Sequence, residues 1–134
     1  MPHVVVEYSA NLEADIAPRQ LVEAVHGAVL AFPAFEKPGV RTRAARREHF
    51  LVAEGDPEDA FIAVTIRIGP GRDVATRKAA SDAVMDALVA ATGAIYQRRG
   101  LALSVEVTEL DDAGMTRRSN LRDRMRARAS GGEP

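Results

Sequence analysis

Residues 61–68 read FIAVTIRI and lead into Gly-Pro-Gly at 69–71, and this stretch decides the predicted fold. The β-branched, apolar run is typical of a buried strand, which the Gly-Pro-Gly loop ends sharply. Asp73 then suits the N-cap of a long helix running to about Arg98. The buried face of that helix is expected to hold Val84, Met85, Leu88, Val89, Thr92 and Ile95.

A half-buried strand follows Gly100, where apolar and polar residues alternate in LALSVEVT (101–108). The first half of the chain repeats the order of strand, helix and strand. HVVVEY (3–8) predicts a buried strand, and Pro18 fits the first turn of an amphipathic helix that stops before Pro33. Residues 40–52 predict a second strand, which either runs on or bends into a hairpin.

The predicted fold is therefore α+β, with two fused β-α-β units at about residues 2–55 and 60–110. Such units give parallel strand pairs, so together they form a four-stranded sheet with both helices on one face. The other face would stay uncovered. We therefore expect a homo-oligomer in which neighbouring subunits bury the apolar strand residues, with a ferredoxin-like monomer as the alternative. Those residues are Val4, Val6, Ile62, Val64, Leu103 and Val105.

Composition excludes several other classes of protein. The 134 residues include 18 Lys and Arg, 19 Asp and Glu, three His and no Cys. A disulfide scaffold is excluded, and a zinc or iron–sulfur site lacks ligands. No apolar run approaches the roughly 20 residues of a membrane helix, and the N-terminus does not resemble a signal peptide, so we expect a cytoplasmic protein. The formal net charge of −1 argues against a general nucleic-acid binder.

The C-terminal segment, residues 111–134, differs from the rest because it is rich in arginine and ends in SGGEP. Leu121 and Met125 lie four residues apart, which predicts a short helix with one apolar edge that docks on a neighbouring subunit. We expect an oligomerisation segment with a disordered end. Its arginines fit a solvated or intersubunit face better than a nucleic-acid contact.

Three residues are candidates for chemistry. Removal of Met1 would leave Pro2 as a secondary amine, and such an α-amino group has a reference pKa of about 7.7–8, which burial or nearby cations lower further. Arg72 follows the Gly-Pro-Gly loop at a predicted helix start, where a guanidinium and free N–H groups suit one anion. Arg41 begins a predicted strand and offers a second guanidinium, whose paired donors match a carboxylate.

Four segments, PHVVVE (2–7), GVRTR (39–43), IRIGPGR (66–72) and LALSVEVTEL (101–110), together resemble the 5-carboxymethyl-2-hydroxymuconate isomerase family of the tautomerase superfamily. The resemblance extends in order from residue 2 to about residue 125. It implies a homotrimer without cofactor or metal, in which Pro2 is the catalytic base and Arg41 and Arg72 bind and polarise the substrate.

The implied reaction is an isomerisation. Pro2 would take the 2-hydroxyl proton of a dicarboxylate or tricarboxylate dienol and return a proton to C5, giving the 2-oxo-3-ene isomer, in homoprotocatechuate catabolism. The related 4-oxalocrotonate tautomerases carry the proline and both arginine positions in one short unit. Here each half keeps one arginine, so one doubled chain is expected to build one site.

Further candidates for substrate binding are Arg43, with Arg46 and Arg47, for an extra carboxylate, and Phe35, Phe50 and Phe61 for an apolar wall. Their alternatives are a solvated hairpin for the arginines and plain core for the phenylalanines. We assign no role to His3 or His49. Two other functions stay open: a tautomerase relative that hydrates or decarboxylates unsaturated acids, and a non-catalytic trimeric module that binds carboxylates.

Overall fold

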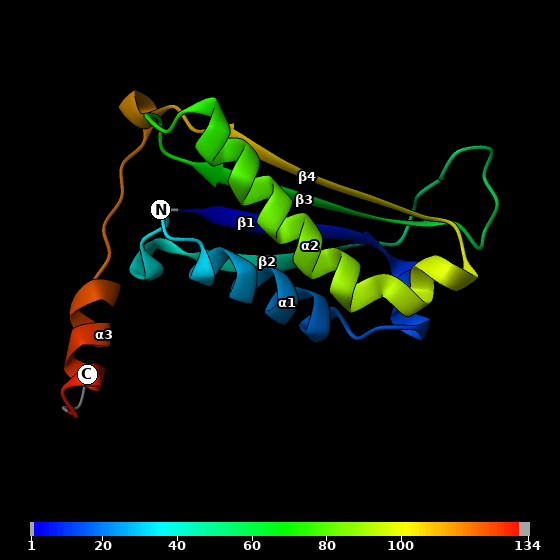
Figure 1. The fold of residues 1–134 in the computed structure, drawn as a ribbon, viewed down its shortest axis with the longest axis horizontal. Coiled ribbons are helices and arrows are strands. Elements are labelled where there is room, and N and C mark those ends of the chain that lie inside the picture. Colours follow the sequence, from blue (N-terminus) through cyan, green and yellow to red (C-terminus); the bar gives the residue numbers. More distant parts are fainter. Residues whose placement is uncertain (1, 132–134) are drawn as a thin grey trace.

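The computed structural model describes residues 2–131 and has the predicted order of strand, helix and strand twice (Figure 1). The first unit consists of β1 (His3–Ser9), α1 (Pro18–Ala31) and β2 (Arg41–Arg47). The second consists of β3 (Ala60–Ile68), α2 (Val74–Arg98) and β4 (Leu101–Glu109). A third helix, α3 (Leu121–Ala129), follows near the C-terminus, and short 3-10 turns are η1 (Ala10–Ala14), η2 (Lys37–Gly39) and η3 (Asp112–Gly114).

The four strands form one sheet in the order β2-β1-β3-β4. Strands within each unit are parallel, as their crossover helices require, and β1 pairs antiparallel with β3. His3 therefore lies opposite Arg41 on one side and Arg67 on the other. The start of β1, the start of β2 and the end of β3 meet at one end of the sheet, which we call the Pro2 end.

Both long helices begin where the sequence predicts. Pro18 is the first residue of α1, and α1 stops at Ala31, two residues before Pro33. The carboxylate of Asp73 accepts a hydrogen bond from the Thr76 N–H at 2.8 Å, which caps α2 and lowers the Asp73 pKa. The helices cover one face of the sheet, as predicted.

The buried core lies between that face and the helices. The apolar strand residues that we expected neighbouring subunits to cover face α1 and α2 instead, so this part of the prediction is wrong. Val4, Val6, Ile62 and Val64 are at most 1% exposed within the single chain. Leu103 and Val105 pack against the same cluster.

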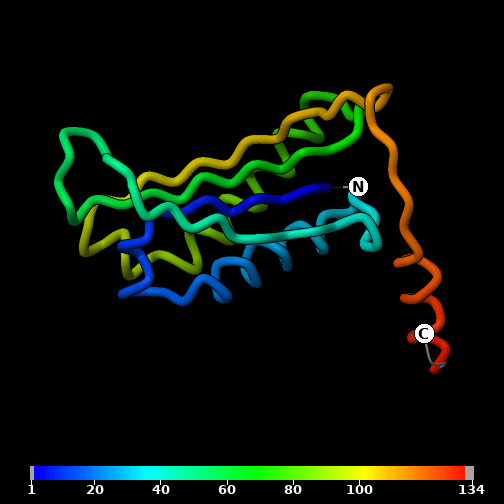
Figure 2. Tube along the Cα trace, turned by 180° about the vertical axis from the view of Figure 1, so that it is seen from behind, coloured from blue at the N-terminus to red at the C-terminus, as the bar shows by residue number. Residues whose placement is uncertain are grey.

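The open face of the sheet, seen from behind in Figure 2, carries the alternate residues of each strand. These are largely polar: His3, Glu7, Arg41, Arg43, Arg47, Thr65, Arg67, Ser104, Glu106 and Thr108. In β1 and β3, apolar residues lie on both faces of the sheet. The sequence alone therefore does not show which face the helices cover.

The buried stripe of α2 also differs in part from the prediction. It consists of Ala80, Val84, Leu88, Thr92 and Ile95. Val89 is 53% exposed and, with Met85, lines a groove between α2 and β4. The buried residues of α2 repeat mostly every four positions. Met85 and Val89 each follow a buried residue by one position, so they lie on the side of the helix next to the buried face. Burial of the Thr92 hydroxyl is tolerated because it donates to the Leu88 carbonyl at 2.7 Å.

The predicted strand at residues 40–52 is shorter than expected and does not bend into a hairpin. β2 ends at Arg47, and residues 48–59 form a loop in which Ala53 and Gly55 have positive φ angles of 50° and 98°. Asn11 donates its side-chain amide to the carbonyls of Pro57 (3.1 Å) and Asp59 (2.8 Å). This loop crosses to β3 at the end of the sheet opposite Pro2.

The C-terminal helix α3 stands away from the sheet (Figures 1 and 2). It contacts η2, and Arg122 forms an ion pair with Glu36. Leu121 is 38% exposed, so the predicted apolar edge is incompletely covered within the chain. The disordered end was expected at residues 130–134. Ser130 and Gly131 close the end of α3 with bonds to the carbonyls of Arg126 and Arg128, both at 3.1 Å. Residues 132–134, like the expected removal of Met1, lie outside the described residues. Across residues 2–131, no helix is long and apolar enough to cross a membrane.

Candidate active site

Pro2 lies buried immediately before β1, the second strand of the sheet. Its carbonyl accepts a hydrogen bond from the Arg41 N–H at 3.1 Å. This bond continues the β1–β2 pairing by one residue, so the backbone of Pro2 is fixed against the start of β2. The two sequence-predicted residues Pro2 and Arg41 are therefore neighbours across the sheet.

Arg41 follows η2, the short turn that leads into β2. Its guanidinium donates to the carbonyl of Gly39 at 3.0 Å, which holds the side chain near the start of the strand. The residue is half-buried, and it forms no ion pair with a carboxylate of residues 2–131. Most of its five N–H donors thus remain available to a ligand.

Arg72 reaches the same end from the loop after β3. Gly71 takes a φ of 113°, which turns the chain toward the start of α2. The Arg72 guanidinium donates to the Ala34 carbonyl at 2.8 Å and lies 5.5 Å above the centre of the Phe35 ring. The connection between α1 and β2 therefore holds Arg72, and the same connection leads into Arg41.

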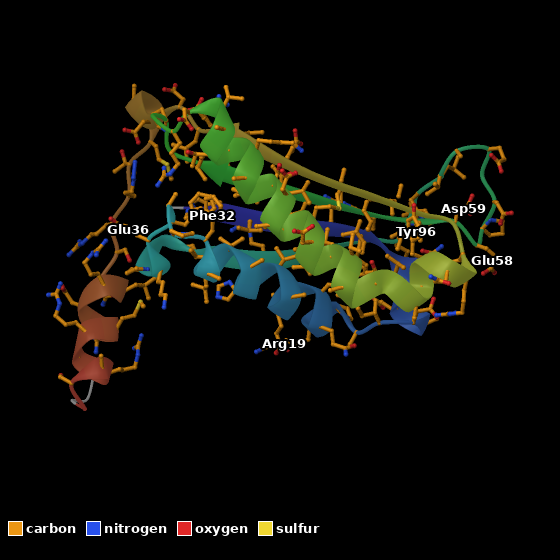
Figure 3. All side chains as sticks on the ribbon, viewed as in Figure 1. Arg19, Phe32, Glu36, Glu58, Asp59 and Tyr96 are labelled. Atoms are coloured by element: carbon orange, nitrogen blue, oxygen red, sulfur yellow. The ribbon has the colours of Figure 1, made fainter. Side chains whose placement is uncertain are left out.

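Phe35 is 5% exposed and packs against Phe32, with ring centres 5.0 Å apart. Figure 3 shows Phe32 close to the Pro2 end. Phe35 thus supports Arg72 through a cation–π contact and belongs to the hydrophobic core. The alternative of plain core thus holds for Phe35, and its role in an apolar wall for the substrate stays a prediction.

Phe50 does not join these residues within one chain. It lies in the loop beyond β2, with its ring 6.2 Å from that of Phe61 in an edge-on arrangement. Phe61 is near the start of β3, at the end of the sheet opposite Pro2. The structure therefore separates Phe50 from Pro2, Arg41 and Arg72 by the length of the sheet.

Arg43, Arg46 and Arg47 differ in what they contact. Arg46 donates to Glu13 at 3.0 Å, and Arg47 donates to Glu7 at 2.6 Å. Glu13 also accepts from the Tyr8 hydroxyl at 2.5 Å, and burial with this bond raises the pKa of Tyr8 to about 12. Both arginines are thus used within the chain, whereas Arg43 has no carboxylate partner among the described residues.

Sequence reasoning missed two residues beside this site, His3 and Arg67. One Arg43 nitrogen lies 3.4 Å from Nδ1 of His3. The pKa of His3 is lowered by burial first and then by Arg43, Arg41 and Arg67. Knowledge of the strand pairing would have identified both residues, because His3 is the cross-strand partner of both Arg41 and Arg67.

Groups of acidic or histidine side chains do not gather here. Within residues 2–131, no three His, Cys, Asp or Glu residues are placed to hold a metal ion. The arrangement at the Pro2 end instead combines the buried Pro2 with several guanidinium groups. Guanidinium groups suit anionic oxygens as ligands, which is the chemistry that the sequence predicts for this end.

The doubled β-α-β architecture gives the class of fold, which is tautomerase-like. A fused 4-OT wild-type symmetric trimer shares it, with a TM-score of 0.62 over 86% of this chain and 92% of that chain, at 11% identity. The family model for 5-carboxymethyl-2-hydroxymuconate isomerase matches residues 2–125. The chain belongs to the 5-carboxymethyl-2-hydroxymuconate isomerase family, which confirms the resemblance and makes the chain an isomerase.

Two relatives illustrate the similarity. The 5-carboxymethyl-2-hydroxymuconate Delta-isomerase of Escherichia coli is 30% identical over 110 residues, which span 82% of this chain and 87% of the relative. The crystal structure of a 5-carboxymethyl-2-hydroxymuconate isomerase from Deinococcus radiodurans R1 is 35% identical, with a TM-score of 0.83 over 92% of this chain and 93% of that one. The likeness therefore covers both β-α-β units.

Proposed function

We propose that the chain converts 5-carboxymethyl-2-hydroxymuconate, or a closely related 2-hydroxymuconate dienol, to its 2-oxo-3-ene isomer, with the amine of Pro2 as the base. The observation that carries the proposal is the hydrogen bond from the Arg41 N–H to the Pro2 carbonyl, at 3.1 Å. It fixes the first residue of the processed chain against the backbone of Arg41, at the start of β2. Family membership supports the same reaction.

The base requires removal of Met1, because only then is the Pro2 nitrogen a secondary amine and not an amide. Burial and nearby guanidinium groups disfavour the protonated amine, so they favour its neutral form. A neutral amine then accepts the proton of the substrate's 2-hydroxyl group.

The electron pair of the broken O–H bond forms the C2 carbonyl. The C2–C3 double bond moves to C3–C4, and the electrons of the C4–C5 double bond take a proton from the proline ammonium at C5. Proline ends the cycle as a neutral amine, so the reaction balances without an oxidant or a cofactor.

Arg41 and Arg72 supply positive charge that stabilises the substrate while its double-bond electrons move. Negative charge develops on the 2-oxo oxygen and the adjacent carboxylate while the proton is on proline. Guanidinium groups held in place before the reaction stabilise that charge without reorganising. The carbonyls of Gly39 and Ala34 and the Phe35 ring hold the two side chains in position.

The assembly we propose is a homotrimer with one site per chain, as the fused symmetric trimers of similar fold support. The groove between α2 and the free edge of β4, with exposed Val89 and Tyr96, is a surface that a second copy would cover. The proposed oligomerisation segment, residues 111–134, would dock on a neighbour through the apolar edge of α3. A role in homoprotocatechuate catabolism in the cytoplasm completes the proposal.

The decisive test concerns the chain terminus. Intact-mass measurement is expected to show protein without Met1, and ketonisation of 2-hydroxymuconate is followed by ultraviolet absorbance. Pro2→Ala and a variant with one retained residue before Pro2 should each lose about 10²-fold or more in kcat, as expected for loss of a positioned base.

Pro57→Ala, in the loop at the opposite end of the sheet, is the matched control and should keep its activity. Wild-type rates in the Pro2→Ala or extended variant, with folding verified by circular dichroism, would refute the mechanism.

A further inference from the structure

A row of basic side chains crosses the open face of the sheet at the Pro2 end. Arg41, His3 and Arg67 are direct cross-strand partners on β2, β1 and β3, so their side chains share one face. Arg43 lies two residues beyond Arg41 on the same strand and therefore on the same face. Thr108 is the β4 partner of Arg67 and completes the row without a negative charge.

These arginines are not neutralised within the chain. Among residues 2–131, Arg41, Arg43 and Arg67 form no ion pair with a carboxylate, whereas Arg46 and Arg47 at the other end of β2 each do. No two of these three arginines are direct cross-strand partners, because His3 lies between Arg41 and Arg67, and Val5 faces Arg43. Glu106, opposite Thr65, is the acid nearest in register on this face, and it forms no ion pair among the described residues. The Pro2 end of the face thus carries positive charge without a fixed counter-ion, and an external anion would supply one.

His3 provides an independent observation that points to the same ligand. Arg43 is a donor only, so the 3.4 Å contact to Nδ1 makes that nitrogen the acceptor and leaves the hydrogen on Nε2. Nε2 is buried and has no hydrogen-bond partner among the described residues. A buried N–H donor without an acceptor is costly. Nε2 has almost no accessible surface in this conformation, so an external oxygen reaches it only when the His3 ring turns toward the open face. An anionic oxygen is the acceptor that the surrounding cations favour there.

The geometry points to a second anion subsite, made by His3, Arg43 and Arg67, that binds a carboxylate of the substrate remote from the reacting hydroxyl. The inference rests on the proposed function, in which Arg41 and Arg72 hold the carboxylate and oxygen at C1 and C2. A tricarboxylate dienol carries two more carboxylates. The subsite would thus make the enzyme selective for a tricarboxylate over a dicarboxylate.

The competing explanation is that a carboxylate of a second copy fills the row at a subunit contact. The two differ in a measurable way. Loss of a subunit contact changes the oligomeric state and lowers turnover of all substrates together, whereas loss of a substrate subsite changes only the preference among substrates.

The kinetic test compares kcat/KM for 5-carboxymethyl-2-hydroxymuconate with kcat/KM for 2-hydroxymuconate. Arg67→Gln and Arg43→Gln should each lower the ratio of the two values about tenfold or more, mainly through KM of the tricarboxylate, since each removes a charge-assisted hydrogen bond. Arg47→Gln is the matched control, because it removes the same charge from the same face but at the opposite end, and its ratio should equal that of the wild type.

An unchanged ratio in the Arg67 and Arg43 variants would overturn the subsite. So would an equal loss on both substrates with a change of molecular mass in light scattering. Arg43→Lys is a second control, which distinguishes loss of the charge from general damage to the fold. It keeps the positive charge, so its ratio of the two kcat/KM values should lie between those of Arg43→Gln and the wild type.

A binding measurement separates this inference from the proposed reaction. The ring proton signals of His3 are followed by NMR while propane-1,2,3-tricarboxylate or glutarate is added to wild-type protein and to Arg67→Gln. Tricarboxylate should shift the His3 signals and raise the His3 pKa in the wild type, with an apparent affinity about tenfold weaker in Arg67→Gln. A shift without turnover would uphold the subsite and reject the isomerase mechanism, whereas turnover without any shift would reject the subsite.

Discussion

The two ends of the sheet use arginine in opposite ways. At the end away from Pro2, Arg99 donates to Asp15 at 2.8 Å and to the carbonyls of Glu58 (2.8 Å) and Asn11 (3.3 Å). Arg98 adds a second bond to Asp15 at 3.0 Å. Figure 3 shows Glu58 and Asp59 at this end, and Phe32 and Glu36 at the other.

At the Pro2 end, Arg41 and Arg72 contact carbonyls and an aromatic ring, and neither they nor Arg43 and Arg67 pair with a carboxylate of the described chain. Other arginines at this end do form ion pairs, Arg77 with Glu109 and Arg122 with Glu36. A carbonyl holds a guanidinium in place without cancelling its charge. The difference therefore concerns the four arginines without a carboxylate partner: their charge is left uncompensated, which supports the proposed anion site, whereas Arg98 and Arg99 stabilise the fold.

The largest effect that tests this contrast is expected at the Pro2 end. Arg72→Gln removes a guanidinium from the proposed site and should lower kcat/KM about 10²-fold or more, because charge on the substrate oxygens is no longer stabilised. Its thermal midpoint should fall less than that of an Arg99 variant, since only one hydrogen bond and the contact with the Phe35 ring are lost and no ion pair is broken. Steady-state kinetics and thermal melts of the same preparation check both. Unchanged kinetics would remove Arg72 from the site.

The opposite pattern is expected at Arg99, whose side chain is only 9% exposed. Arg99→Met keeps the packing of the stem but leaves the Glu58 and Asn11 carbonyls and Asp15 without their donor. The free energy of unfolding should fall by about 2 kcal/mol, measured by urea titration, with unchanged kcat/KM per folded molecule.

Arg19→Met is the matched control, because Arg19 is an exposed helix residue paired with Glu23. It should show no measurable loss of stability. If the free energy of unfolding fell equally in both variants, the hydrogen bonds around Arg99 would stabilise the fold no more than an exposed ion pair does.

The smallest effect concerns acid. Hydrogen bonds from Arg99 and Arg98 lower the pKa of Asp15 below its ordinary value of 3.8. When pH falls through 3.8, the unfolded chain therefore binds a proton before the folded chain does, and stability declines until the folded pKa is passed. Asp15→Asn should show a flatter decline of urea midpoint between pH 5 and 3 than the wild type. Parallel curves would contradict this role.

Much of the fold follows from sequence because strands and helices carry their own signals. Asp73 and Pro18 mark helix starts by local chemistry, and the alternation after Gly100 marks β4. The faces of the sheet were assigned wrongly because Val4 and Ile62 look equally apolar whichever side the helices cover. The hairpin was wrong because the loop after Arg47 depends on distant contacts from Asn11.

The candidate site was found only in part for the same reason. Pro2, Arg41 and Arg72 stand out because each follows a chain start or a Gly-containing turn. His3 and Arg67 belong beside them only through pairing between β1 and β3, which are about sixty residues apart in the chain. Phe50 was grouped with them by residue type, whereas its position beyond β2 takes it to the opposite end.

The loop at residues 48–59 lies at the end of the sheet away from Pro2, and its Leu51 is 88% exposed. It is the only covalent link between the two β-α-β units. A cut there would leave two fragments, each with one parallel strand pair, that must reassociate along β1 and β3. The chain could thus be split at this loop without disturbing its first residue, whereas a circular permutation that joins the termini would abolish the free amine.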